Sequence, residues 1–522
     1  MTAAIHARDM ATTRDAALRG PGLYDAVKRV VMARPLAWLM LLGAMLRVWA
    51  ALTPGFHHPD AIYQYLEPAH RLLTGEGVIT WEWRTGIRSW MLPALLAIPL
   101  GIGEAIYPNG LLPMILPRFA TAAASLGIIW AAWDIGRRHS ATTGVLAGIV
   151  AATWFEIVFF AAETLAEPIA VTAFLPAAAL LTARHAGPRR IAAAGALFAF
   201  AALARPHYAP AAAVLVLVEW RRDLFDGKRW AMLLAGALAV AAASAIVDAA
   251  RGLVPFAWIL GNFEQNIVHN VSARYGTFPA LAYVAWFMEV WSWWMVPAVI
   301  GILYGWRQAP GLLAAAAVTL VIHSLIPHKE YRFIFLAFTV LVILAALGWG
   351  EIIAIARARL SQGQAHAVTV GVFAAFALAS IGLAQGKLAP NQLSPNADGW
   401  RTFAHLRADP AVCGVALVKP ASFAVLPGAV ALRRGTPISM FWTGDSADPA
   451  DRPMANALAH QAGFNRIVTA TQGTLRVPAG WRVDHCEQSW NIRMCVLARS
   501  GGCTGASESP FLINRAMART GL

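Results

Sequence analysis

One segment of the sequence gathers acidic, basic and imidazole side chains closely enough to do chemistry. It runs from His57 to Arg71 and reads HHPDAIYQYLEPAHR. Proline suits the first turn of a helix, and aspartate there favours the positive helix end, so we expect a helix that begins near Asp60. At about 100° per residue the polar side chains would share one face. That face would carry Asp60, Gln64, Glu67 and Arg71, flanked by His58 and His70. Two carboxylates there predict a pocket, and a surface helix lying on lipid is the alternative.

A second group consists of Glu156, Glu163 and Glu167. Spacings of seven and four predict that all three lie on one side of a single helix. Glu156 falls within an apolar stretch, where a carboxylate must face protein or water. These residues are therefore candidates for substrate binding, with structural pairing to an arginine as the alternative. Arg47 is a candidate for that pairing, for holding a lipid phosphate through its guanidinium fork, or for snorkelling to the interface.

A third cluster, His328-Lys329-Glu330-Tyr331-Arg332, lies between two apolar stretches. Its basic groups need an anionic partner, and we expect a lipid phosphate to be held by His328, Lys329 and Arg332. A salt-bridged turn is the alternative. Weaker candidates are amide, aromatic and basic side chains that suit sugar hydroxyls. These substrate-binding candidates are Arg88, Arg205, His207, Asn266, His269 and Tyr275. The sequence shows neither zinc-ligand spacing nor a glycine-rich nucleotide loop, so we expect no metal and no cofactor.

The composition indicates which elements position these clusters. Of the 522 residues, 58% are hydrophobic and only 13% are charged, about half the charged share of a typical soluble protein. Apolar runs long enough to cross a bilayer recur from Leu36 to Leu383. The net charge is +14. The lysines and arginines lie mostly in short hydrophilic breaks between these runs, as the positive-inside rule predicts for a membrane protein. A polytopic α-helical protein with about eleven spans is therefore expected, and nucleic-acid binding is not.

Using the basic breaks as inner markers places every polar cluster on the outer side. We expect a cytoplasmic arm (residues 1–35), a transmembrane domain (36–387) with outer loops at 53–113, 251–279 and 328–332, and an extracytoplasmic α/β domain (388–505) followed by a tail (506–522). Residues 144–162 are expected to form one span, and residues 90–101 an interfacial or re-entrant piece. Cys413, Cys486, Cys495 and Cys503 all follow the last span. They fit disulfides in an oxidising compartment or four free thiols, and the pairing is open.

Three elements of the sequence resemble glycosyltransferase family 22, the dolichol-phosphate-mannose-dependent mannosyltransferases. The run His58-Pro59-Asp60, continued by Gln64, Leu66-Glu67, Ala69-His70, Trp81-Glu82-Trp83 and Ile87-Arg88-Ser89, resembles the family's first luminal loop. Arg205-Pro206 is similar to its Ala-Arg-Pro element, and the segment His328–Phe333 to its His-Lys-Glu-x-Arg-Phe element. The elements occur in the family's order across most of the membrane part.

The resemblance implies a GT-C fold and inverting transfer of a sugar, with mannose expected, from a polyprenyl-phosphate donor to a glycan or glycolipid acceptor. It implies that Asp60 is the catalytic carboxylate. Ala61 stands where the family usually has glutamate, which shifts the supporting role to Glu67 or to Glu163 and Glu167. The Ala-rich sequence suggests a bacterial inner membrane with the site on the periplasmic face. Alternatives are another sugar, such as arabinose or glucose, and a lipid-linked sugar transporter.

Overall fold

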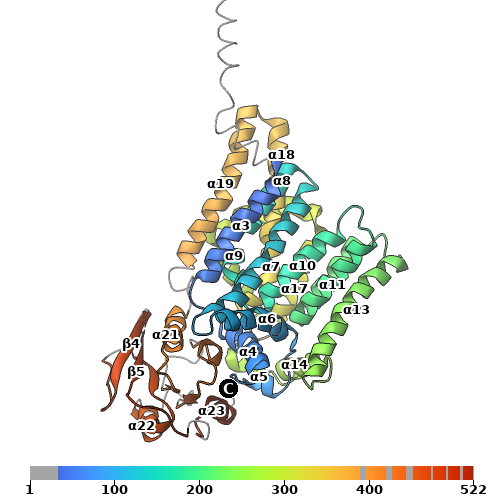
Figure 1. Ribbon diagram of the computed structural model, residues 1–522. Helices are drawn as coiled ribbons and strands as arrows, with labels where there is room; N and C mark the ends of the chain where they lie inside the picture. The colour runs from blue at the N-terminus through green and yellow to red at the C-terminus, as the bar shows by residue number, and fades with distance from the viewer. Residues whose placement is uncertain are drawn as a thin grey trace, which may run out of the picture.

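The computed structural model describes residues 33–387, 396–418, 426–441, 451–471, 474–489, 492–505 and 509–520. Most of the expected N-terminal arm lies outside these residues. A helical bundle occupies one part of the molecule, and a small sheet domain is docked at one end of it (Figure 1). The start of α3 and the α18–α19 connection lie toward the other end (Figure 1). The expected order of membrane domain and C-terminal domain is therefore seen.

The helices of the bundle follow the apolar runs of the sequence. They are α3 (Pro35–Leu52), α6 (Met91–Ile106), α7 (Leu112–Arg137), α8 (Ala141–Thr153), α9 (Phe155–Phe160), α10 (Ala166–Leu181), α11 (Pro188–Ala204), α12 (Ala209–Glu219), α13 (Gly227–Ala250), α15 (Ala282–Trp291), α16 (Met295–Gly305), α17 (Pro310–Leu325), α18 (Phe335–Arg359) and α19 (Gln362–Lys387). Short outer elements are η1 (Ala61–Leu66), α4 (Glu67–Thr74), α5 (Trp81–Arg84), α14 (Ala257–Phe263), η3 (Glu264–Val268), η4 (Val271–Tyr275) and η7 (Tyr331–Ile334).

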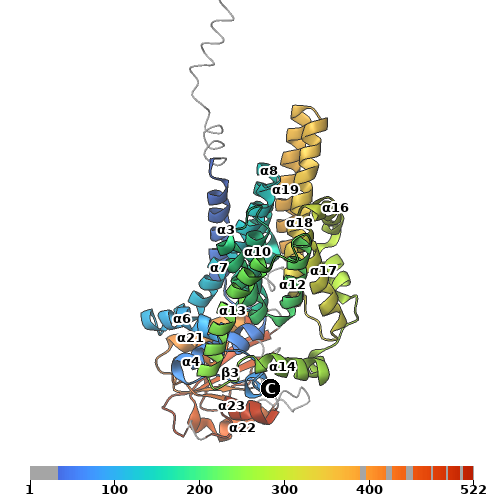
Figure 2. The same ribbon diagram turned by 90° about the vertical axis from the view of Figure 1, so that its right-hand side faces the viewer.

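Each of the expected spans corresponds to a helix or to a broken helix in this order. Within the described residues, six helices are long and apolar enough to cross a bilayer, and four shorter apolar helices accompany them. The chain is therefore a multi-pass membrane protein, with fewer full-length spans than the eleven expected. Figure 2 shows α6 projecting sideways near the outer-loop end of the bundle, the arrangement expected of an interfacial helix.

Helix α18 lies at the centre of the bundle, with most of its apolar stretch buried by the other helices. It approaches α16 through glycines: a Cβ built on Gly348 would lie 1.8 Å from the carbonyl oxygen of Gly301. Helices α11 and α13 meet in the same way, since a Cβ on Gly195 would lie 1.9 Å from the carbonyl oxygen of Leu233. Small residues that allow close backbone approach are a general device of membrane helix packing. The central position of α18 fixes η7, which precedes it.

The prediction of one helix over residues 144–162 is wrong. Helix α8 ends at Thr153, Trp154 has an extended backbone (φ −60°, ψ 126°), and the short α9 follows. Glu156 lies in α9, Glu163 in the connection after it, and Glu167 in the first turn of α10. The three carboxylates therefore do not share one helix face.

The helix expected to begin near Asp60 is present, but its first turn, η1, has π winding. A π turn bonds i to i+5 and shifts the phase of the residues after it. The polar side chains predicted to share one face therefore point in different directions, and residues 61–70 are all buried. The alternative of a helix resting on lipid does not hold either.

The C-terminal domain is a five-stranded sheet in the order β2-β1-β3-β5-β4. The strands are β1 (Val415–Leu417), β2 (Ile438–Met440), β3 (Arg466–Thr471), β4 (Arg482–Ser489) and β5 (Ile492–Ala498), with helices α21 (Ala397–Ala408), α22 (Asp451–Ala459) and α23 (Ile513–Thr520). Strands β1 to β3 are parallel, whereas β5 is antiparallel to both of its neighbours. The expected small α/β domain is thus seen. Helix α23 lies within the segment expected to be a tail.

Two disulfides connect the four cysteines, Cys413 to Cys503 and Cys486 to Cys495. The second joins the paired strands β4 and β5. The sequence had left both the pairing and the presence of disulfides open.

Candidate active site

Arg332 joins the first and third sequence clusters at one point. Its guanidinium donates to Asp60 Oδ2 at 2.7 Å, to Glu167 Oε1 at 3.1 Å and to Glu330 Oε2 at 2.6 Å. Its side chain is only 4% exposed. A planar guanidinium is suited to bind several carboxylates at fixed angles. The His-Pro-Asp and His-Lys-Glu-Tyr-Arg segments therefore meet on one side of the bundle, as the threading predicted.

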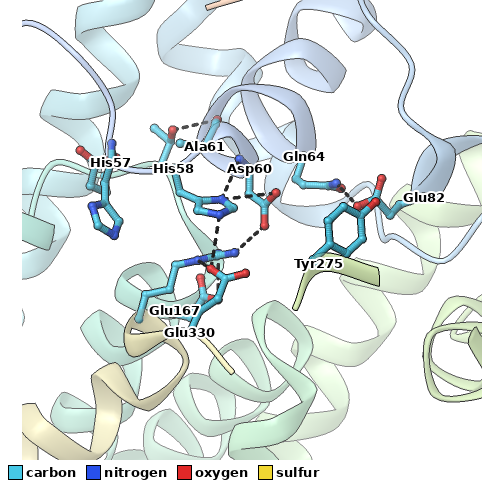
Figure 3. A network of polar contacts seen from close by, with 12 residues as sticks. His57, His58, Asp60, Ala61, Gln64, Glu82, Glu167, Tyr275 and Glu330 are labelled. Carbon is cyan, nitrogen blue, oxygen red and sulfur yellow. Dashed lines mark hydrogen bonds and ion pairs between the residues drawn. The ribbon is translucent and has the colours of Figure 1, made fainter. Parts of the chain in front are cut away.

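His58 lies between two of these carboxylates (Figure 3). Its Nδ1 accepts the backbone N–H of Asp60 at 3.2 Å and lies 3.5 Å from Asp60 Oδ1. Its Nε2 lies 3.3 Å from Glu330 Oε2. Because Nδ1 is an acceptor here, the ring proton belongs on Nε2 and points toward Glu330. His58 thus fixes the turn at which Asp60 begins its helix.

The electrostatic surroundings keep Asp60 ionised. Burial raises the pKa of its carboxyl, but the positive charge of Arg332, with a smaller contribution from the neighbouring His58, outweighs burial and holds the pKa well below its ordinary value. The same guanidinium lowers the pKa of Glu330 against the effect of burial. An ionised carboxylate that retains some exposure, 27% of its side chain, can accept a proton from a bound hydroxyl group.

Glu156 anchors the segment that carries Arg332. It accepts hydrogen bonds from the hydroxyl of Tyr331, from Trp154 Nε1 at 2.8 Å and from Trp291 Nε1 at 2.9 Å. Tyr331 immediately precedes Arg332, so this buried carboxylate helps to aim the guanidinium at Asp60. Trp154 marks the break between α8 and α9, which places Glu156 beside η7.

Glu163 anchors the other side of the site. Its Oε2 accepts the backbone N–H of His57 at 3.1 Å. Burial raises the pKa of the Glu163 carboxyl, and the positive charge of the nearby Arg118 partly offsets that rise. Arg118 itself donates to the carbonyl oxygens of Ala50, Thr53 and Gly55. Glu156 therefore contacts η7, Glu163 contacts the loop before Asp60, and Glu167 contacts the guanidinium of Arg332.

A pocket lies next to this network, between the first outer loop, the end of α11 and α14. It is lined by Gln64, Tyr65, Trp83, Arg88, Ser89, Met91, Leu92, Leu203, Ala204, Arg205, Pro206, His207, Trp258 and Asn262. Apolar side chains and two guanidinium groups thus face the same space. Such a lining suits an anionic group attached to a hydrocarbon chain.

Several polar atoms around the pocket lack a hydrogen-bond partner among the described residues. Within the described part of the chain, no partner is found for six buried atoms, which are Gln64 Oε1, Trp83 Nε1, Arg88 Nε, Arg205 Nε, His207 Nδ1 and Trp258 Nε1. Arg205 pairs with Glu167 at 3.3 Å, and Arg88 reaches Glu82 only at 3.8 Å. Buried donors and acceptors are normally satisfied, so these atoms are available to a ligand.

Gln64 and Tyr275 lie on the far side of Asp60 from His58 (Figure 3). Gln64 donates to Glu82 Oε1 at 2.5 Å, and Trp81 Nε1 donates to the hydroxyl of Tyr275 at 2.8 Å. The loop that ends at Tyr275 is thereby connected to the first outer loop.

His328 and Lys329 brace the backbone. The Lys329 ammonium donates to the carbonyl oxygens of Ile326 and Phe278, and His328 contacts the carbonyl oxygen of Gly276 and the carboxylate of Glu330. Their positive or donor groups are occupied by protein oxygen atoms. The cations that face the pocket are Arg88 and Arg205.

Other candidates lie outside this pocket. Arg47 donates to Ser125 and to the carbonyl oxygens of Gly43, Ala151 and Ala152, so it satisfies groups freed by the break after α8. Its guanidinium therefore binds the C-terminal carbonyl groups of α8 and two groups inside α3 and α7, rather than a carboxylate, a lipid phosphate or the membrane interface. Glu67 and His70 are buried and are not among the residues that line the pocket. His269 is exposed and pairs with Glu264 at 3.5 Å, and Asn266 contributes its backbone carbonyl to Ser272.

The sequence reasoning did not place several residues that the structure brings to the site. The sequence indicates Glu330, Tyr331 and Glu82 only as members of motifs and predicts no contact for them. Asn262 and Trp83 belong to segments whose polar and aromatic side chains suit a sugar, whereas the sequence predicts no role for Trp258. An alternation of charges, as in Lys329-Glu330-Tyr331-Arg332, could have suggested that Glu330 and Arg332 pair with each other in an extended stretch.

The fold and the site define the chain as a membrane protein of the GT-C class. The crystal structure of ArnT from Cupriavidus metallidurans bound to undecaprenyl phosphate superposes with a TM-score of 0.57 at 13% identity, covering 89% of this chain and 98% of that chain. Residues 38–411 match the Alg9-like mannosyltransferase family. The chain therefore belongs to the Alg9-like mannosyltransferase family, which confirms the resemblance found in the sequence.

Individual relatives agree with this assignment. GPI mannosyltransferase 3 of Yarrowia lipolytica is 28% identical over 324 residues, which cover 57% of this chain and 59% of that protein. GPI alpha-1,2-mannosyltransferase 3 of Danio rerio is 26% identical over 313 residues, 53% of this chain and 52% of that protein. The chain thus spans between half and three fifths of the length of these two relatives.

Proposed function

We propose that this chain transfers mannose from a polyprenyl-phosphate donor to a hydroxyl group of a glycan or glycolipid acceptor. The observation that carries the proposal is the ionised carboxylate of Asp60, fixed by Arg332 at 2.7 Å, beside a pocket that combines free guanidinium donors with an apolar wall. Family membership supports mannose as the sugar. The glycolipid acceptor follows the printed names of the eukaryotic relatives.

In the proposed reaction the acceptor hydroxyl binds at Asp60 Oδ1, which Arg332 leaves free. Its oxygen attacks the anomeric carbon, the bond from that carbon to the phosphate oxygen breaks, and the sugar configuration inverts. The hydroxyl proton passes to Asp60, and the polyprenyl phosphate leaves with the electron pair of the broken bond. Arg88 and Arg205 stabilise the charge that develops on the phosphate. His207 and Gln64 are placed to contact the phosphate or the sugar.

The revised phosphate site is part of the proposal. The sequence suggested Arg47, His328, Lys329 and Arg332, but their donor groups are engaged with protein oxygen atoms. Arg88 and Arg205 line the pocket and each keep an unpartnered Nε within the described residues. Arg332 acts instead on Asp60.

We further propose that the site faces the outside of a bacterial inner membrane. The two disulfides of the C-terminal domain support an oxidising compartment, and the basic breaks of the sequence support the orientation. The bacterial membrane itself rests on the Ala-rich composition. The relatives named above come from eukaryotes, in which the equivalent face would be luminal.

The test is a transfer assay with the purified protein in detergent. Polyprenyl-phosphate mannose, glucose and arabinose are each offered with a lipid extract as acceptor source, and products are identified by mass spectrometry. We expect a mannosylated lipid product from the mannose donor. A transporter would give no product in detergent, where no compartments exist, and a product only from glucose or arabinose would replace mannose in the proposal.

A further inference from the structure

Glu67 has a different environment from the one its sequence position suggested. Its side chain is fully buried, at 0% exposure, and α4 begins with it. One oxygen, Oε2, accepts the backbone N–H of Val78 at 2.6 Å, and the other, Oε1, accepts the backbone N–H of Val430 at 2.9 Å. Val78 belongs to the first outer loop and Val430 to the C-terminal domain. Among the described residues no cation forms an ion pair with Glu67.

The loop of the C-terminal domain that holds Val430 is shaped around this carboxylate. Gly428 has a left-handed backbone (φ +73°), and a Cβ at that position would lie 2.2 Å from Glu67 Oε1. One turn earlier in η1, the hydroxyl of Tyr63 donates to the carbonyl oxygen of Leu426 at 2.9 Å. Residues 426–432 therefore rest directly on the helix that begins at Asp60. We call them the docking loop.

Arg407 fastens the docking loop from its other side. This guanidinium, from α21, donates to the carbonyl oxygens of Val430 at 3.0 Å and Leu432 at 2.7 Å. It also reaches Glu104 at 2.7 Å and the carbonyl oxygen of Pro108 at 2.9 Å, both on the membrane domain side. The docking loop is thus held between α21 and η1, with little freedom to move relative to either.

We infer that Glu67 is a positioning residue through which the C-terminal domain sets the place of Asp60. Asp60 directly precedes η1, and Tyr63 and Glu67 on the same continuous helix contact the docking loop. One end of this short helix is therefore fixed by Arg332 and the other by the C-terminal domain. A buried carboxylate held only by backbone N–H groups is costly for stability compared with an apolar side chain, and it specifies one register between the two surfaces.

The inference rests on the proposed function for its kinetic readout, but its structural readout is independent of that function. The test variants are Glu67→Gln, which replaces one acceptor oxygen by a donor, and Gly428→Ala, which crowds the same oxygen. The matched control is Glu76→Gln, because Glu76 also accepts a backbone N–H of the C-terminal domain, from Gly435 at 2.8 Å. Glu76 is exposed and lies beyond the end of α4.

The first measurement is hydrogen exchange of the substrate-free protein. We expect faster exchange in residues 56–74 in both test variants, and wild-type exchange there in Glu76→Gln. The second is transfer kinetics. Displacing a reacting group by about 1 Å costs up to 100-fold in rate, so kcat should fall about 10- to 100-fold in the test variants while the donor KM stays close to that of the wild type.

A third readout is the acidic limb of the pH profile of kcat/KM. If the helix shifts, Asp60 loses part of its contact with Arg332, and this limb moves to higher pH in the test variants but not in the control. Unchanged exchange, kcat and pH profile in Glu67→Gln would overturn the inference, as would equal effects in Glu76→Gln. Absence of transfer by the wild type, with the exchange result intact, would count against the proposed function and leave this coupling standing.

Discussion

Arg332 Nη2 lies 2.7 Å from Asp60 Oδ2, although the two residues are 272 positions apart in the chain. The contact joins the first outer loop to η7, which directly precedes α18, the most buried of the six long apolar helices among the described residues. It explains how a carboxylate on a loop is held in a fixed orientation.

Replacement of Arg332 by glutamine should destabilise the protein. Asp60, Glu167 and Glu330 would lose a shared cation, and removal of one partner from a buried ion pair typically costs about 3–5 kcal/mol. Thermal unfolding in detergent measures the effect. Arg274→Gln is the control, since Arg274 is exposed on the outer loop. Equal melting temperatures for the two variants would contradict the role assigned to Arg332.

Replacement of Arg88 by glutamine should weaken use of the donor. Loss of a guanidinium aimed at a developing phosphate charge predicts a fall of about 100-fold in kcat/KM. Arg88→Gln is more informative than Arg205→Gln, because Arg205 also pairs with Glu167. The measurement is donor titration at saturating acceptor.

Arg251→Gln is the matched control for that experiment. Arg251 is exposed at the end of α13 and lies over the ring of Trp90, near the pocket but not in its lining. If both variants lost activity to the same extent, general surface charge rather than a phosphate site would be responsible.

The pH dependence of stability should include a contribution from Glu67. Burial raises the pKa of its carboxyl from 4.5 to about 7. Below pH 4.5 the carboxyl is protonated in both the folded and the unfolded chain and does not change the free energy of unfolding. As the pH rises toward 7, the unfolded chain releases its proton first, so the free energy of unfolding falls by about 1.4 kcal/mol per pH unit.

Glu67→Gln lacks this titration, so its stability should fall less between pH 4.5 and pH 7 than that of the wild type. Denaturant unfolding at several pH values measures the difference. His70, whose pKa burial lowers to about 4, titrates in both proteins and cancels in the comparison. Parallel curves for the two proteins would show that the carboxyl of Glu67 does not titrate in this range.

The orientation in the membrane can be tested with single new cysteines. Arg482 is exposed in the C-terminal domain, and Gln362 is exposed at the α18–α19 connection toward the other end of the bundle (Figure 1). A membrane-impermeant maleimide added to intact cells should label Arg482→Cys and leave Gln362→Cys unlabelled until the membrane is opened. The reverse pattern would place the site on the cytoplasmic face.

The sequence predicted the features that depend on local hydrophobic pattern and on the preference of basic residues for one side of the membrane. Apolar runs located the helices, and basic breaks correctly placed the segments of Asp60 and Arg332 on one side. It could not predict helix phase where the backbone departs from regular winding. The π turn after Asp60 and the extended Trp154 have no periodic signal, and each redirected carboxylates that regular helices would have aligned.

The contact partners of buried charged side chains could not be predicted from the sequence either. Arg47 was read from its residue type, but its contacts depend on the carbonyl groups that the α8 break leaves free. Glu67 contacts Val430 across 363 positions of the chain, a pairing that no spacing rule encodes. Long-range packing, rather than propensity, decides such contacts.

The most direct test of the account is the activity of Asp60→Asn in detergent with polyprenyl-phosphate mannose. Asparagine keeps the size of the side chain and a hydrogen bond to Arg332, but it cannot accept a proton. Asp223→Asn, on an exposed carboxylate at an inner break, is the control. We predict that Asp60→Asn binds the donor, unfolds at a temperature close to that of the wild type and forms no mannosylated product. Turnover at the wild-type rate by this variant would remove Asp60 from the mechanism and contradict the account.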